Sequence, residues 1–65
     1  MTKFYVYRVV THNGHKSYKR TKCTDSWVEG KEKCWQFSKQ GAKGIVEAYN
    51  SCSRGFYTYG MEPVE

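Results

Sequence analysis

The dipeptide Asn13-Gly14 lies between two stretches that favour β-structure, and it restricts the fold more than any other feature of the chain. Residues 3–11 are mostly β-branched or aromatic, which favours a strand. An Asn-Gly pair supplies the positive φ angles that a two-residue type I′ turn requires at both of its central positions. We therefore expect residues 1–23 to form a basic β-hairpin in which residues 15–23 return as the second strand.

A two-residue turn also predicts the register, with Val9 opposite Tyr18 and Arg8 opposite Lys19. Side chains alternate between the two faces of a strand, so each face of the hairpin receives its own set. The tyrosine face carries Tyr5, Tyr7, Val9, Lys16, Tyr18, Arg20 and Lys22, and the second face carries Phe4, Val6, Arg8, Val10, Ser17, Lys19, Thr21 and Cys23. The pattern leaves open which face is buried, because both sets include apolar side chains; we take the tyrosine face as the outward one.

The remainder of the chain indicates a third strand, one helix and a last strand. Residues 24–32 have the composition of a loop, and residues 33–37 favour a short strand. Ser38 is a suitable N-cap, and an apolar residue recurs at helical spacing through residues 38–52. Residues 56–62 favour a strand that Pro63 closes. The sequence predicts a single α+β domain over residues 1–65, a sheet of three to four strands covered on one face by one helix, in the order β-β-β-α-β.

The positive charge of this chain is concentrated at one end. The net charge is +5 over 65 residues, and six Lys and Arg residues but no Asp or Glu precede residue 25. Such asymmetry indicates an anionic partner. We expect a non-enzymatic protein that binds DNA or RNA, with phosphates contacted by four cations and bases stacked or packed by three tyrosines. The predicted contact residues are Lys16, Lys19, Arg20, Lys22, Tyr5, Tyr7 and Tyr18.

Two further features are typical of protein docking. Gly41, Gly44 and Ala48 fall on one narrow arc of the expected helix, where small side chains permit close approach of another protein or of a second copy in a homodimer. Trp27 lies in a polar segment, where an exposed indole would serve as an interface anchor. Ordinary packing explains both features as well, with the small residues against the chain's own sheet and Trp27 as a lid over the core.

The pattern indicates neither catalysis nor a cofactor. His12 and His15 flank the turn, but the hairpin holds no carboxylate to orient either ring. Cys23, Cys34 and Cys52 lack the Cys-x-x-Cys spacing of structural zinc sites, and we interpret them as reduced thiols in or near the core. No targeting or membrane-spanning segment is indicated, so we expect a cytoplasmic protein.

Trp35-Gln36-Phe37-Ser38, followed by Ala42, resembles the W-x-F-S-x-x-x-A joint between strand and helix in small accessory proteins of tailed bacteriophages. That resemblance implies a protein of the host cytoplasm that binds and modulates a host protein, an alternative partner with an acidic surface. The order of three strands and a helix also resembles apetala-type plant DNA-binding domains and the arm-binding domains of tyrosine recombinases, which press a sheet into DNA. This chain departs from both by its strand after the helix and by lacking their arginine-rich first strand.

Overall fold

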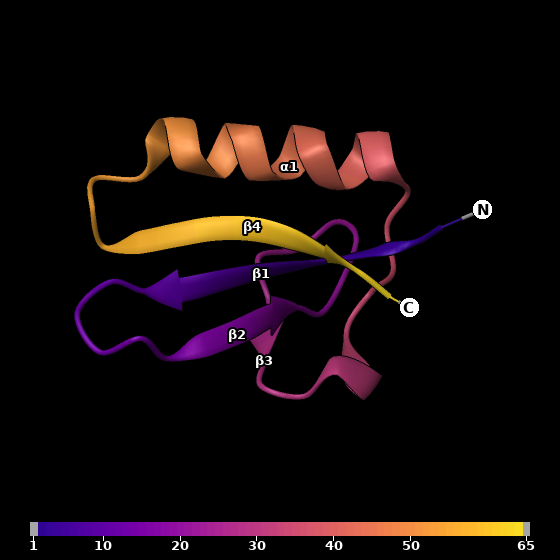
Figure 1. The fold of residues 1–65 in the computed structure, drawn as a ribbon, viewed down its shortest axis with the longest axis horizontal. Helices are drawn as coiled ribbons and strands as arrows, with labels where there is room; N and C mark the ends of the chain where they lie inside the picture. The colour runs from indigo at the N-terminus through magenta and orange to yellow at the C-terminus, as the bar shows by residue number, and fades with distance from the viewer. Residues whose placement is uncertain (1, 65) are drawn as a thin grey trace.

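In the computed structural model, which describes residues 2–64, four antiparallel strands form one sheet with a single helix beside it. The elements in chain order are β1 (Phe4–Val10), β2 (Lys16–Lys19), β3 (Trp27–Val28), the 3₁₀ turn η1 (Lys31–Lys33), α1 (Lys39–Cys52) and β4 (Tyr57–Pro63). The strand order is β3-β2-β1-β4, and Figure 1 shows α1 running along β4 with β3 at the far margin. The predicted α+β class is confirmed; residues 1 and 65 of the expected domain lie outside the described residues.

The hairpin of β1 and β2 is present, but its turn is longer than expected. The amide of Gly14 donates to the carbonyl of Val10 at 2.7 Å, and the amide of Val10 donates to the carbonyl of His15 at 2.9 Å, so residues 11–14 form the loop. Gly14 has a φ of 75°, whereas no non-glycine residue among residues 2–64 has a positive φ, which excludes a type I′ turn. The side chain of Asn13 instead accepts a hydrogen bond from the amide of His15 at 2.9 Å.

The longer loop shifts the register of the hairpin by two residues without exchanging its faces. Tyr7 lies opposite Tyr18 and Val9 opposite Lys16, in place of the predicted pairs. Because side chains alternate with a period of two, a shift of two residues leaves the side chains of β1 and β2 on their predicted faces. The division into a tyrosine face and a second face therefore holds for the two strands, but the assignment of residues 20–23 to these faces is wrong, because they lie in the loop beyond β2.

The third strand differs from the prediction. The second strand ends at Lys19 rather than at residue 23, because the amide of Arg20 donates to Ser26 at 2.8 Å and closes residues 20–26 into a loop. The third strand, Trp27–Val28, lies within the segment that was expected to be a loop. The expected strand at residues 33–37 is reduced to one antiparallel bridge, in which Phe37 exchanges two hydrogen bonds of 2.7 Å with Phe4. Phe37 thus occupies the edge of β1 that the early departure of β2 leaves free.

The helix begins and ends where the sequence indicates, and it covers the second face. The hydroxyl of Ser38 accepts a hydrogen bond from the amide of Gly41 at 3.1 Å, which caps the first turn of α1. Val6, Phe37 and Ala42 form the buried core, and five half-buried apolar side chains pack against it. These are Phe4, Trp27, Ile45, Val46 and Met61. The tyrosine face therefore points away from the helix. Strand β4 begins one residue later than predicted and pairs antiparallel with all of β1.

Candidate functional site

The three tyrosines of the outward face pack against one another rather than lying open. Tyr18 contacts Tyr5 and Tyr7 edge to face, with ring centroids 5.9 and 6.4 Å apart. Tyr5 and Tyr18 are buried, and the ring of Tyr7 lies over Gly60 of β4. The tyrosines thus form a small second core, and they offer little ring surface for stacking on bases.

One carboxylate of the chain pairs with two lysines here and offsets part of their positive charge. The ammonium group of Lys16 lies 2.9 Å from one carboxylate oxygen of Glu62, and that of Lys31 lies 2.8 Å from the other. Hydrogen bonds from these two lysines hold the pKa of Glu62 below its usual value, and the same carboxylate raises the pKa of Lys16. The sequence did not reveal this network, since Glu62 reaches Lys16 only through the pairing of β4 with β1.

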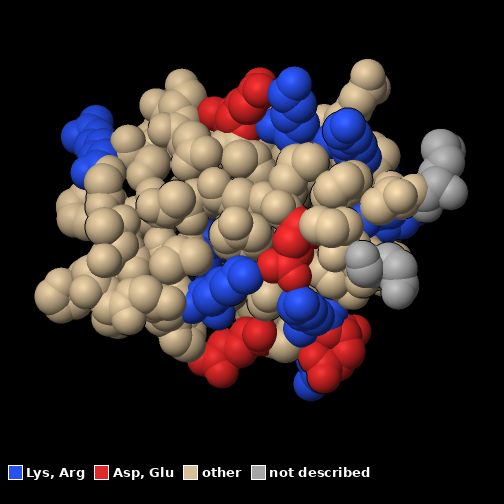
Figure 2. Space-filling model, viewed as in Figure 1, with Lys and Arg blue, Asp and Glu red and all other residues tan. Residues whose placement is uncertain are grey.

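The four predicted phosphate contacts do not share one surface. Lys19 lies on the second face with 4% of its surface exposed, and its ammonium group donates to the carbonyl of Thr24 at 2.7 Å and to the hydroxyl of Tyr49 at 3.3 Å. Arg20 and Lys22 lie in the loop beyond β2, where both are exposed. On the side of the molecule in Figure 2, acidic and basic groups lie next to each other. The hairpin therefore does not present a continuous basic ribbon.

Trp27 belongs to an aromatic cluster beneath the end of the helix. Its ring lies 5.8 Å from both Tyr49 and Tyr59, which stack on each other at 4.8 Å. The carboxylate of Asp25 accepts hydrogen bonds from the Trp27 indole at 2.8 Å and the Tyr49 hydroxyl at 3.1 Å. The indole hydrogen bond lowers the pKa of Asp25, while burial and the neighbouring carboxylate raise that of Tyr49. The half-buried Trp27 acts as the lid rather than as an exposed anchor.

The small-residue arc of α1 does not pack on the sheet. A methyl group added at Gly44 would meet no atom within 4 Å, and one added at Gly41 would approach only the hydroxyl of Ser38. Ala48 is likewise exposed. The interpretation that these residues bring the helix close to its own sheet is wrong, because Ala42, Ile45 and Val46 form the packed face instead.

Two adjoining hollows form a trough along the exposed side of α1. Their volumes are about 500 and 390 Å³, and they share Lys22 and Ile45. Between them they are lined by Lys3, Lys19, Lys22, Cys23, Trp35, Gln36, Phe37, Ser38, Gly41, Ile45, Ala48, Tyr49 and Cys52. Among residues 2–64, no Asp or Glu lines this trough. Trp35 on its wall is 47% exposed, so the trough combines an open indole with Lys3 and Lys22, which form no ion pair within residues 2–64.

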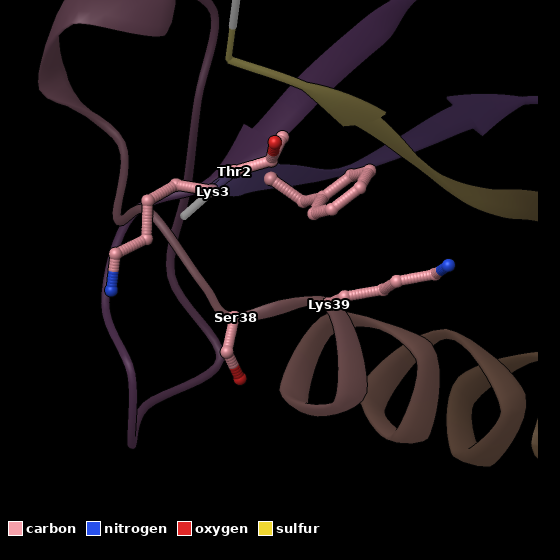
Figure 3. Close-up of a pocket in the computed structure, with 5 residues that line it drawn as sticks. Thr2, Lys3, Ser38 and Lys39 are labelled. Atoms are coloured by element: carbon pink, nitrogen blue, oxygen red, sulfur yellow. The ribbon is translucent and has the colours of Figure 1, made fainter.

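A third hollow continues the trough around the start of the helix. It has a volume of about 360 Å³, is lined by Thr2, Lys3, Phe4, Ser38 and Lys39, and shares Lys3 and Ser38 with the trough. Figure 3 shows Lys3 and Lys39 on either side of Ser38, with their ammonium groups pointing apart. The cations therefore follow a path across the surface instead of converging on one point.

The histidines and cysteines do not assemble into a reactive centre. The imidazole of His15 lies 3.1 Å from the carboxylate of Glu29, but both side chains are more than half exposed. Cys23 and Cys52 are exposed, contrary to the expectation that the thiols lie in or near the core, while burial raises the pKa of Cys34. Residues 2–64 hold no group of three or more metal-ligating side chains.

No helix in the described part of the chain has the length and apolar character needed to cross a membrane. The sequence matches no family model and no curated protein, and the fold matches no solved structure.

Proposed function

We propose that this protein is a non-enzymatic binder of single-stranded nucleic acid, and that the trough beside α1 is its binding surface. The observation that carries the proposal is the half-exposed indole of Trp35 beside Lys3 and Lys22, in a hollow that no carboxylate lines among residues 2–64. The proposal keeps the partner that the charge pattern predicts and moves the contact surface from the hairpin to the helix.

Single strands expose the two groups that such a trough binds. Their bases stack on aromatic side chains, a contact worth about 1–3 kcal/mol per base, and their phosphates attract lysines. Trp35 offers the stacking surface, and Lys3 and Lys22 lie in the same hollow as counter-charges. Ser38 and Lys39 at the start of α1 line the third hollow at the end of the path, where Lys39 adds a further cation.

The size of the hollow favours a single strand over a duplex. A volume of about 500 Å³ lies within the range of roughly 300–1,000 Å³ that small-molecule pockets occupy, which suits a base with its sugar. A duplex keeps its bases stacked inside and presents only phosphates and groove edges to a protein. An indole on the wall of a narrow hollow therefore contributes more to the binding of an unpaired base.

The test is a titration of fluorescently labelled oligo(dT) and oligo(rU) across a series of salt concentrations. Two phosphate contacts, one for each of Lys3 and Lys22, predict a log–log salt slope of about −1.4 for a single strand. The double variant Lys3→Gln/Lys22→Gln should flatten this slope, and Trp35→Ala should weaken binding about tenfold or more, in line with the loss of one stacked base. Lys33→Gln/Lys43→Gln, which removes two charges outside the trough, is the matched control for the double variant.

Two results would overturn the proposal. One is the absence of binding by the parent protein at low salt, and the other is unchanged affinity of the Trp35→Ala variant. Poly-glutamate of equal charge serves as the competitor that represents an acidic protein surface. If it binds as tightly as the oligonucleotides, the trough recognises charge alone, and a modulator of a host protein becomes the better description.

A further inference from the structure

Arg8 on β1 is held between two aromatic rings on the helix side of the sheet. The central carbon of its guanidinium lies 4.7 Å from the ring centroid of Trp27 and 4.5 Å from that of Tyr57. The two rings belong to strands at opposite margins of the sheet, β3 and β4. Both distances fall within the range of about 6 Å over which an aromatic ring attracts a cation, so both rings stabilise the position of the guanidinium.

The nitrogens of Arg8 have no hydrogen-bond acceptor within residues 2–64 and are not completely buried. No hydrogen bond or ion pair joins the guanidinium to a carbonyl or carboxylate of those residues. Every buried side-chain nitrogen and oxygen of residues 2–64 has a hydrogen-bond partner, so an Arg8 nitrogen without one reaches the surface. The two rings therefore lie close to the guanidinium, and its N–H donors have no hydrogen-bond acceptor within residues 2–64.

The charged groups around Arg8 do not accept a hydrogen bond from its guanidinium. Asp25 is near enough for Arg8 to lower its pKa, but its carboxylate already accepts hydrogen bonds from Trp27 and Tyr49. Lys19, the other cation of this face, donates to neutral acceptors only, Thr24 and Tyr49. This half-buried cluster therefore holds two cations against one carboxylate, and it has one positive charge in excess.

We infer that Arg8, clamped by Trp27 and Tyr57, is a receptor for an oxyanion whose two oxygens accept its N–H donors side by side. A planar fork of donors matches the paired oxygens of a phosphate or a carboxylate, and such charge-assisted pairs are about twice as strong as neutral hydrogen bonds. The shared chemistry of these two groups defines the ligand class. Arg8, Trp27 and Tyr57 do not line the trough, although their neighbours Lys19 and Tyr49 do.

The experiment uses inorganic phosphate and acetate as probes at constant ionic strength. In the Trp35→Phe background, Trp27 is the only tryptophan of the chain, so its fluorescence reports the clamp. Saturable quenching or enhancement by phosphate or by acetate supports the proposal and says which of the two ligand chemistries the clamp prefers. No saturable change with either probe overturns it.

Matched variants distinguish the contribution of the planar pair of N–H donors from that of the positive charge. Arg8→Lys keeps the positive charge and loses the planar pair of donors, so we expect about a tenfold weaker affinity, the loss of one charge-assisted hydrogen bond. Tyr57→Leu removes one ring without changing any charge and should also weaken binding. Equal affinity of Arg8→Lys and the parent overturns the inference, and so does loss of binding in Lys22→Gln, because it would place the anion in the trough. Circular dichroism shows that each variant is folded.

Discussion

Gly60 on β4 is the position at which a single methyl group tests the packing of the tyrosine face. It lies directly opposite Tyr7, whose ring covers it. A methyl group built on Gly60 would collide with the hydroxyl of Tyr7, and it would lie 2.5 Å from the ring carbon that bears this hydroxyl. The Gly60→Ala variant therefore forces the ring of Tyr7 away from the sheet.

The steric cost should exceed the gain in backbone entropy. Replacing a glycine within a strand by alanine stabilises a protein by about 0.5–1 kcal/mol through the unfolded chain. Overpacking typically costs about 1–3 kcal/mol. Displacing the ring also disturbs the edge contact between Tyr7 and Tyr18 and the contact with the Lys16 ammonium, which lies 4.3 Å from the Tyr7 ring centroid. We expect Gly60→Ala to lower the free energy of unfolding by about 1–2 kcal/mol.

A double-mutant cycle with Tyr7→Val assigns this cost to the ring. Valine keeps the strand propensity and removes the aromatic group, so Gly60→Ala in that background should be neutral or stabilising by up to ~1 kcal/mol. Urea unfolding at pH 7 measures all four free energies, and the coupling should be about 1–3 kcal/mol. If Gly60→Ala destabilises both backgrounds equally, the ring does not lie over Gly60 and the packing described for this face is incorrect.

Three further outcomes follow from other contacts. Gly44→Ala on the open side of α1 should raise the free energy of unfolding in urea by about 1 kcal/mol, because the added methyl group meets no neighbour. A lower free energy of unfolding would mean that this side of the helix is covered. Ser38→Ala should cost about 1 kcal/mol in the same assay by removing the cap, and Ser51→Ala is its exposed control. Because the folded pKa of Glu62 is lowered, its stabilising contribution is present above about pH 4 and is lost as the pH falls through the folded pKa. Thermal unfolding from pH 6 to pH 2 should therefore show a weaker acid dependence in Glu62→Gln than in the parent, and identical curves would refute the network.

The sequence predicts the elements of this fold more reliably than their pairings. Local signals located the hairpin, the cap at Ser38 and the helix, because each depends on residues only a few positions apart. The turn was predicted too short, since Asn13 uses its side chain to accept from His15 instead of adopting a positive φ. Strand β3 was missed because two residues carry no periodicity, and it exists only through its pairing with β2.

The candidate surface was harder to predict than the fold, because it depends on which charged side chains pair with other groups of the chain. Lys16 belongs to the face assigned to it, but its partner Glu62 lies 46 residues away and reaches it only across β1. Lys19 was correctly placed on the second face, whereas its burial among Thr24 and Tyr49 follows from the path of the loop at residues 20–26. A count of charges along the chain thus predicts the sign of the surface but not its location.

Both surfaces proposed above have one structural cause, which is that a single helix cannot cover four strands. Neighbouring strands lie about 4.8 Å apart, so the sheet is about 14 Å wide from β3 to β4, whereas a helix with its side chains is about 10 Å across. Helix α1 lies over β4 and β1 and leaves the β2 and β3 half of the same face to the loop at residues 20–26 and the ring of Trp27. A loop and an indole close that half less completely than a second helix would. Lys22 and Trp35 therefore border an open trough, and Arg8 keeps donors without an acceptor in residues 2–64.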